Sequence, residues 1–290
     1  MSSINFNAGA TSALETLRGI NKDLQKTQNN ISTGERVNSA ADGVSYWSIS
    51  TTMKSDNKAL GAAQDALGVG AAKVDTAYAA TESAIDVVNE IKAKLVTASE
   101  SSADKEQIQL EVKKLQEQLV AVAKAASFNG ENWAVIGTQD SASVVDGFVR
   151  ESGSVKVTTA TYDLAGNALF ETVGAGTGTG GLLGDLMTIT LAAANTQSDI
   201  DGFMTTVETA LKGMTKAGAA LGALTTRIDM QDSFASKISD AIDSGVSRLV
   251  DADMEEESAK LSALQTQQQL AVQSLSIANS SGQNILRLFQ

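Results

Sequence analysis

Residues 203–249 read FMTTVETALKGMTKAGAALGALTTRIDMQDSFASKISDAIDSGVSRL, and their spacing decides the fold. Stepping alternately by four and three residues from Phe203 to Leu249, every position reached is apolar except Gln231 and Gly245. This alternation is typical of the inner positions of a coiled coil. A helix of this length rises on the order of 70 Å. We therefore expect it to pack against another helix of comparable length.

The partner helix is predicted over residues 44–96. Along it a seven-residue repeat places Tyr46, Met53, Leu60, Leu67, Val74, Thr81, Val88 and Leu95 on one stripe. The run 97–106 is rich in Ser and Asp, whose side chains compete for backbone hydrogen bonds, so the helix is expected to break there. A second, shorter helix follows and is predicted to end near Phe128-Asn129-Gly130.

Both ends of the chain carry similar patterns. From Phe6 to Ile31 the same alternating step meets only one polar residue, Thr27, and the stretch ISTGERVNSAADG (31–43) favours a linker. Near the other end, residues 261–286 contain no charge and 14 Ser, Thr, Gln or Asn residues. Such a helix is too polar to span a membrane and too uncharged for an ordinary solvated surface. We expect it to contact protein on several sides.

The middle of the chain differs from the two ends in composition. The pieces SVVDGFVR (143–150), SVKVTTATYDL (154–164) and LMTITL (186–191) favour strands, and residues 174–184 are dense in glycine. No helix start follows the glycines, so a flexible surface loop is predicted there and not a phosphate site. The predicted fold class is mainly α: a long antiparallel coiled-coil helical bundle formed by both termini, with a small, water-facing central β/loop module.

The amino-acid composition excludes most enzyme mechanisms and metal sites. The chain has no Cys and no His, which removes thiolate and imidazole nucleophiles, bases and metal ligands, and it has no Pro. We predict no enzyme activity, no catalytic residue, no cofactor and no metal. The acidic run 251–257 is interpreted as a helix start, with Asp253 as N-cap and Glu256 at the third position, and not as a calcium loop. A net charge of −12 argues against nucleic acid and membrane surfaces as partners.

The two ends resemble bacterial flagellin. At the N-terminal end the similarity runs through SALETLRGINKDLQKTQNNISTGERVNSAADG, with the family signature at Thr33, Gly34, Arg36, Val37, Asn38, Ser39 and Ala40. At the C-terminal end it includes Arg248, Asp251, Asp253, Ala278-Asn279, Gln283-Asn284, Leu286 and Leu288. Two departures are Gly282, where many relatives have Pro, and the short stretch 130–200 in place of larger outer domains. The second departure implies a thin filament.

The resemblance implies a domain division and a function. Residues 1–42 with 251–290 would form the inner-tube helices, residues 43–128 with 203–250 a rod-like helical domain, and residues 129–202 the surface-exposed module. The chain would be a structural subunit that self-polymerises into the flagellar filament for swimming motility. By the resemblance it would be extracellular and exported through the growing organelle, and the N-terminal composition predicts that it has no cleavable signal peptide. Implied partners are other flagellin subunits, an export chaperone, the filament cap and hook-junction proteins.

The self-assembly residues are predicted on the terminal seams and their linker. They are Leu17, Ile20, Leu24, Ile31, Arg36, Asn38, Leu264, Leu270, Leu275, Asn284, Leu286 and Leu288. The seam pattern alone leaves open whether these residues face one chain or several. Alternative functions are a hook-filament junction protein, a secreted coiled-coil adaptor, and a secreted hydrolase on a similar scaffold, for which the lack of His excludes the zinc-protease form.

Overall fold

The computed structural model describes residues 7–100, 102–151 and 154–287. It divides into two compact units. The first, Met1–Asn57 with Asp240–Gln290, is called the terminal unit below, and the second, Lys58–Ser239, the rod unit. The predicted three-part domain division stays a prediction. No helix within the described ranges is both long enough and apolar enough to cross a membrane.

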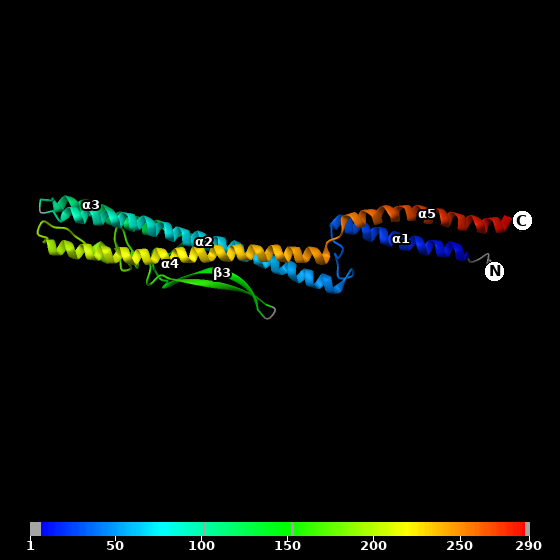
Figure 1. Cartoon of the computed structure of the whole chain (residues 1–290), viewed down its shortest axis with the longest axis horizontal. Helices are drawn as coiled ribbons and strands as arrows, with labels where there is room; N and C mark the ends of the chain where they lie inside the picture. Colours follow the sequence, from blue (N-terminus) through cyan, green and yellow to red (C-terminus); the bar gives the residue numbers. More distant parts are fainter. Residues whose placement is uncertain (1–6, 101, 152–153, 288–290) are drawn as a thin grey trace. The chain divides into compact units, whose positions relative to one another are not determined.

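The helices follow the sequence prediction closely (Figure 1). They are α1 (Ala8–Thr33), α2 (Val44–Ala98), α3 (Lys105–Ala125), α4 (Gln197–Val250) and α5 (Met254–Arg287). Gly34 ends α1 in the left-handed conformation with φ 72°, which only glycine adopts without strain. Asp104 caps α3 by accepting hydrogen bonds from the backbone of Glu106 and Gln107. The predicted linker and the predicted break are both confirmed.

The core of the rod unit lies along the predicted seams. The repeat positions of α2 are buried from Leu60 to Leu95. On α4, Val207 and Met214 join the same hydrophobic cluster as Leu95, and α3 contributes Val112 and Leu119. Three helices therefore share one core, and each hides its apolar stripe against the other two. The prediction that the long helices at 44–96 and from Phe203 onward are partners is confirmed.

Two of the predicted strands form a hairpin. β3 (Ser141–Glu151) pairs antiparallel with β4 (Ser154–Asp163), with Ala142 opposite Tyr162 and Val144 opposite Ala160. These inward residues pack on Leu67 and Val74 of α2 and on Leu221 and Ile228 of α4. The register shifts between Val145 and Gly147, and the bulged residue, Asp146, is buried and forms an ion pair with Arg227 of α4. The bulge thus turns a carboxylate toward the helix.

The third predicted strand, LMTITL, is wrong. Residues Asp185–Thr188 form the short 3-10 helix η1, and Leu186 and Ile189 are buried in the main core. The side-chain amide of Gln116 donates to the carbonyls of Leu186 and Ile189 at 2.9 and 3.1 Å. Because a helix side chain satisfies these carbonyls, the segment has no need of a strand partner. Part of the central module is therefore buried in the core of the rod unit, so the prediction of a water-facing module holds only for the rest of it.

The glycine run, residues 174–184, lies at the surface only in part: residues 174–177 are exposed, whereas Gly178 and Leu183 are buried. A minimal hairpin pairs β5 (Thr172–Val173), just before the run, with β6 (Gly178–Thr179) inside it. A Cβ on Gly178 would lie 2.4 Å from the ring of Phe170, so only glycine fits. A second minimal hairpin, β1 (Ser127–Phe128) with β2 (Glu131–Asn132), turns at Asn129 and Gly130 with φ of 51° and 84°. The helix ends close to the predicted turn.

Candidate self-assembly surface

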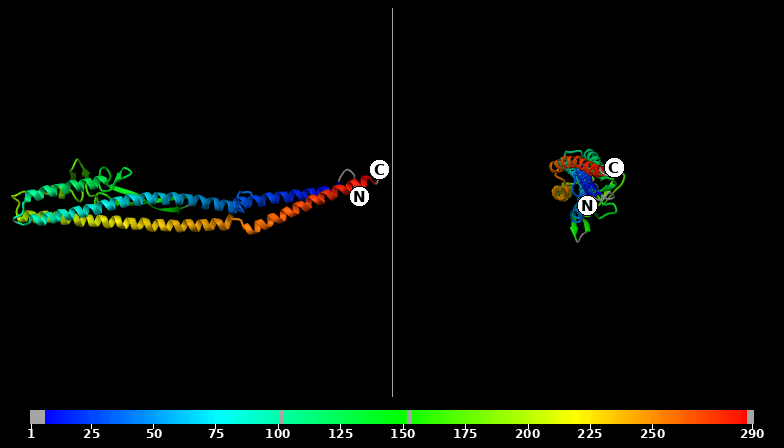
Figure 2. Two further views of the ribbon diagram at one scale, coloured as in Figure 1. Left: turned by 90° about the horizontal axis from the view of Figure 1, so that it is seen from above. Right: turned by 90° about the vertical axis from the view of Figure 1, so that its right-hand side faces the viewer.

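The first and last helices of the chain form an antiparallel pair. Figures 1 and 2 show α1 and α5 side by side within the terminal unit. Three side-chain contacts fix their register: Asn7 Nδ2 to Ala278 O at 2.9 Å, Gln268 Nε2 to Asn21 Oδ1 at 2.7 Å, and Asn30 Nδ2 to Glu257 Oε1 at 3.0 Å. The pairing is polar as well as apolar, and sequence periodicity did not reveal these polar contacts.

The apolar seam of this pair is only partly covered. Leu17, Ile20, Leu24 and Ile31 of α1 are all half-buried. On α5 the positions facing α1 also alternate by four and three, and comprise Glu257, Leu261, Leu264, Gln268, Ala271, Leu275 and Ala278. Of these, Leu264 is buried and Leu275 half-buried. A seam between only two helices leaves one flank of each residue open.

A second apolar stripe on α5 faces away from α1. Leu270 and Ile277 are 59 % and 68 % exposed. They are seven residues apart and therefore share a face. Each lies two residues after a seam position, which is about 200° around the helix. We call Leu270 and Ile277 the outer stripe. The structure thus separates Leu270 from the other predicted residues Leu264 and Leu275, which lie on the inner seam.

The two chain connections of the terminal unit are tied together by backbone hydrogen bonds. Gly34 O accepts from the N–H of Ala252 at 2.9 Å, and Val250 O accepts from the N–H of Arg36 at 2.6 Å. The guanidinium of Arg36 donates to Leu249 O at 3.2 Å. Val37 is buried against this crossing. The predicted residue Arg36 therefore fixes the linker against the end of α4, whereas Asn38 is exposed beside it.

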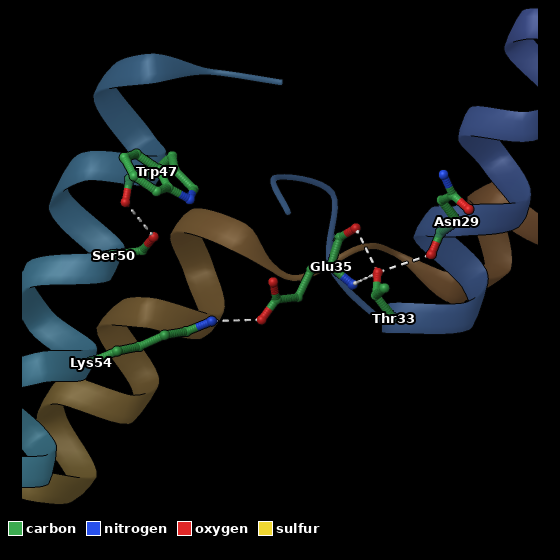
Figure 3. Close-up of polar contacts among 6 residues, drawn as sticks. All are labelled: Asn29, Thr33, Glu35, Trp47, Ser50 and Lys54. Atoms are coloured by element: carbon green, nitrogen blue, oxygen red, sulfur yellow. Dashed lines mark hydrogen bonds and ion pairs between the residues drawn. The ribbon is translucent and has the colours of Figure 1, made fainter. Parts of the chain in front are cut away.

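Side chains hold the linker at both of its ends, and Figure 3 shows the contacts at its start. The hydroxyl of Thr33 donates to Asn29 O at 2.9 Å and accepts from the N–H of Glu35 at 3.2 Å. Lys54 Nζ then binds Glu35 Oε1 at 2.6 Å. Further along, the hydroxyl and the N–H of Ser39 both bind Asp42 and lower the pKa of that carboxyl, with a smaller contribution from Lys26.

The start of α5 is the predicted helix cap. Asp253 Oδ1 accepts from the N–H groups of Glu255 and Glu256 at 3.0 and 3.2 Å, which confirms Asp253 as N-cap. Glu257, one turn on, is buried between the paired helices. Its Oε1 accepts from Asn30, and its Oε2 has no partner among the described residues. Removal of Asn30 would therefore leave a buried carboxylate unsatisfied.

A dense group of exposed apolar side chains surrounds the start of α2. Val44, Tyr46, Trp47 and Ile49 are 37 % to 70 % exposed, and we call these four residues the collar. The guanidinium of Arg36 lies over the Tyr46 ring at 6.0 Å. Sequence periodicity placed Tyr46 on a buried stripe and overlooked the collar. The signal that could have found it is the lack of any charge over residues 43–53.

Three of the predicted residues are not placed by the structure. The side chains of Asn284 and Leu286, and the whole of Leu288, lie outside the described residues. The remaining predicted residues all belong to the terminal unit. Six of them lie on the inner seam between α1 and α5, two lie in the linker and one lies on the outer stripe. The seam residues are Leu17, Ile20, Leu24, Ile31, Leu264 and Leu275, the linker residues are Arg36 and Asn38, and the outer-stripe residue is Leu270.

Two ionisable side chains that line a depression beside β2 are held in structural contacts. This depression of about 430 Å³ contains Lys124 and Glu131. Lys124 donates to Gly174 O. Glu131 pairs with Lys73 at 2.8 Å, and this hydrogen bond lowers the pKa of its carboxyl. A carboxyl with a lowered pKa is a poor general acid or base near neutral pH.

The terminal helices match known proteins. Residues 4–134 match the family model of the bacterial flagellin N-terminal helical region, and residues 204–289 match that of the C-terminal helical region. The chain belongs to the bacterial flagellin family. Flagellin C of Rhizobium meliloti (strain 1021) is 47 % identical over 323 residues, and a flagellin of Brucella melitensis biotype 1 is 45 % identical over 295 residues, each alignment covering 100 % of both chains. Flagellin A of R. meliloti (strain 1021) is 41 % identical over 394 residues, again with full coverage.

These matches decide the function at a coarse level. The flagellin is a structural subunit that self-polymerises into the extracellular flagellar filament, the organelle of swimming motility. They favour the filament subunit over the hook-junction protein and the adaptor. The alignment with Flagellin A extends over 394 positions for a chain of 290 residues, so this flagellin is a short form relative to that protein.

Proposed function

We propose that the α1–α5 pair is the surface through which this flagellin polymerises. The single observation that carries the proposal is the outer stripe, Leu270 and Ile277, exposed on a helix that has no charge over residues 261–286. A charged helix face keeps an isolated subunit soluble, whereas an uncharged face with exposed Leu and Ile gains free energy when another protein covers it. Neighbouring subunits are the available cover in a polymer.

The half-buried inner seam supports the same proposal. Ordering one residue of backbone costs about 1 to 2 kcal/mol. With only partial burial along Leu17, Ile20, Leu24 and Ile31, two helices alone recover little of this cost. We therefore expect the terminal helices to be disordered in the free subunit and helical in the polymer. Contacts of this kind that do not close into a ring build an open helical filament.

The partners and the absence of catalysis are parts of the proposal. An apolar terminal surface would require cover before assembly, which fits an export chaperone, and the filament cap and hook-junction proteins would contact the same surface at the two filament ends. The chain is proposed to be no enzyme, since it has neither His nor Cys. The carboxylate of Glu131 is held in an ion pair, which supports this part of the proposal.

The experiment compares two pairs of substitutions. Leu270→Asp with Ile277→Asp places carboxylates on the outer stripe, whereas Leu110→Asp with Val96→Asp makes the same charge change at exposed apolar sites of the rod unit. The first variant is expected to lose filament formation, because a desolvated carboxylate there has no partner. The control should polymerise, and both should keep the thermal unfolding of the rod. Filaments from the first variant, or from a chain truncated after Asp253, would contradict the proposal.

A further inference from the structure

The exposed apolar residues of this flagellin are distributed unevenly with respect to charge. Most of them, such as Val69, Tyr78 and Leu110, stand alone in a short stretch bounded by Asp, Glu, Lys or Arg. Within the described residues, only two charge-free stretches carry more than one exposed large apolar side chain. These are residues 43–53, which hold the collar, and residues 261–286, which hold the outer stripe and Val272.

Freedom from charge matters because desolvating an unpaired charge is expensive. The chain carries a net charge of −12, so two copies repel each other over most of their surfaces. The collar and the outer stripe are the described surfaces with more than one exposed large apolar side chain in a stretch that itself contains no charge to be removed from water. Aromatic residues are also enriched where interfaces gain most of their free energy, and the collar contains Tyr46 and Trp47.

The collar is held ready for such a contact. The guanidinium of Arg36 lies over the ring of Tyr46, and Arg36 is itself fixed to Leu249 O. Ser50, one turn along α2 from Tyr46, is buried, and its hydroxyl donates to Trp47 O at 3.0 Å (Figure 3). The contact of Arg36 limits the rearrangement of the Tyr46 ring that binding would require, and preorganisation of this kind favours association.

We propose that the collar of one flagellin subunit docks on the outer stripe of α5 of a second copy. The contact joins two different surfaces, so each subunit can give its collar to one neighbour and its outer stripe to another. Such a head-to-tail contact can propagate into an open helical polymer when its rotation does not close a ring, as a filament requires. A collar-to-collar contact would instead be self-complementary and would stop at a dimer. The inference rests on the proposed assembly role of the α1–α5 pair and adds the surface that α5 meets.

The test uses the natural absence of cysteine. Ser48→Cys places a thiol within the collar, and Ser274→Cys places one between Leu270 and Ile277, at four and three residues from them. Both serines are exposed, and the change is nearly isosteric. Filaments are grown from an equal mixture of the two full-length variants, one carrying a mass tag, confirmed by electron microscopy and treated with a short thiol-to-thiol cross-linker.

The expected product is the mixed dimer, tagged with untagged. Each variant polymerised alone should give little dimer, and so should the control mixture of Ser274→Cys with Ser83→Cys, an exposed serine of the rod unit on α2. Normal filaments with no more mixed dimer than the control would overturn the inference while leaving the assembly role of α5 intact. Dimer from Ser48→Cys alone would overturn it as well, since it would show collar meeting collar.

A second measurement does not depend on thiols. Val44→Gln with Ile49→Gln should raise the monomer concentration needed for polymerisation by about tenfold or more, since a loss of 1.4 kcal/mol corresponds to a factor of ten. The matched pair Val69→Gln with Leu110→Gln, also exposed and apolar, should leave it within about twofold. An unchanged threshold for the collar variant would contradict the inference. Failure of the inference therefore differs from failure of the proposed function, which is tested by changes on α5 alone.

Discussion

The rod unit and the α1–α5 pair share the same four-three alternation of apolar residues, but these residues are buried to different extents in the two. In the rod unit, seam residues such as Val88, Leu95 and Met214 are completely buried, because α2, α3 and α4 meet around one core. In the terminal pair, Leu17 and Leu24 are half-buried, because within the described residues the helix packed along α1 is α5. A seam enclosed by three helices makes a stable subunit, whereas a seam between two helices leaves burial available to other copies.

The largest expected effect is a difference between the two seams in how much a buried leucine contributes to the free energy of unfolding of the monomer. Leu95→Ala removes a fully buried side chain from the rod core and should lower its free energy of unfolding by about 2 to 5 kcal/mol. Leu17→Ala, the same change on α1, should alter monomer unfolding by less than about 0.5 kcal/mol. Denaturant unfolding of the two monomeric variants measures both values. Equal losses would mean that the terminal seam is already fully packed in the free subunit.

The sequence predicts the seams well because their period is set within one helix. The four-three alternation from Phe203 to Leu249 falls on buried or half-buried positions throughout α4. The alternation on α5 is weaker, since seam positions include Glu257 and Gln268, and there the pairing depends on the polar partners Asn30 and Asn21 of α1. Such partners come from residues more than 200 positions away, and spacing along one helix cannot identify them.

Other features could not be predicted from the sequence, because they also depend on contacts between residues far apart in the chain. The strand predicted at LMTITL fails because Gln116 of α3 satisfies its carbonyls, which is a long-range contact. The glycine run has loop composition, yet Gly178 is required by the ring of Phe170. The collar lies on a helix whose heptad repeat was correctly recognised. Its exposure depends on what packs beside α2, because Tyr46 has the repeat spacing but is not covered as Leu60 is.

A smaller effect tests the polar part of the terminal pair. Asn30→Ala would leave Glu257 buried without its hydrogen-bond donor, a cost of about 1 to 3 kcal/mol wherever the two helices are packed. We expect filaments of this variant to dissociate at a lower temperature than the wild type, while the monomer unfolds as before. Glu257→Gln is the matched control, because its amide oxygen can still accept from Asn30 and no charge is buried. Equal destabilisation of filaments by both variants would argue against the role of the donor.

The smallest predicted effect is a pH dependence confined to the rod unit. Burial, with a smaller contribution from Asp163, raises the pKa of Tyr162 to about 12, and its ring stacks on Trp133 with 5.7 Å between centroids. The folded state keeps the phenol proton to higher pH than the unfolded chain does. The stability is therefore complete below the ordinary pKa of about 10 and is lost as the pH rises toward 12, by on the order of 1 kcal/mol at pH 11.

This titration can be isolated. Tyr46→Phe with Tyr78→Phe leaves Tyr162 as the single tyrosine of the chain, so phenolate absorbance reports on it directly. Further replacement of Tyr162 by Phe should remove this part of the alkaline loss of stability. A phenolate transition near the ordinary tyrosine pKa in the folded protein would mean that the hairpin is open to water.

Hydrogen–deuterium exchange compares the rod seam and the terminal seam in one sample. Amide exchange is compared between monomer and filament for peptides from α1 and α5 and for peptides from the buried parts of α2 and α4. We expect the rod amides to be protected in both states, and the terminal amides to exchange rapidly in the monomer and to become protected in the filament. Terminal amides protected in the monomer as strongly as those of the rod would contradict it.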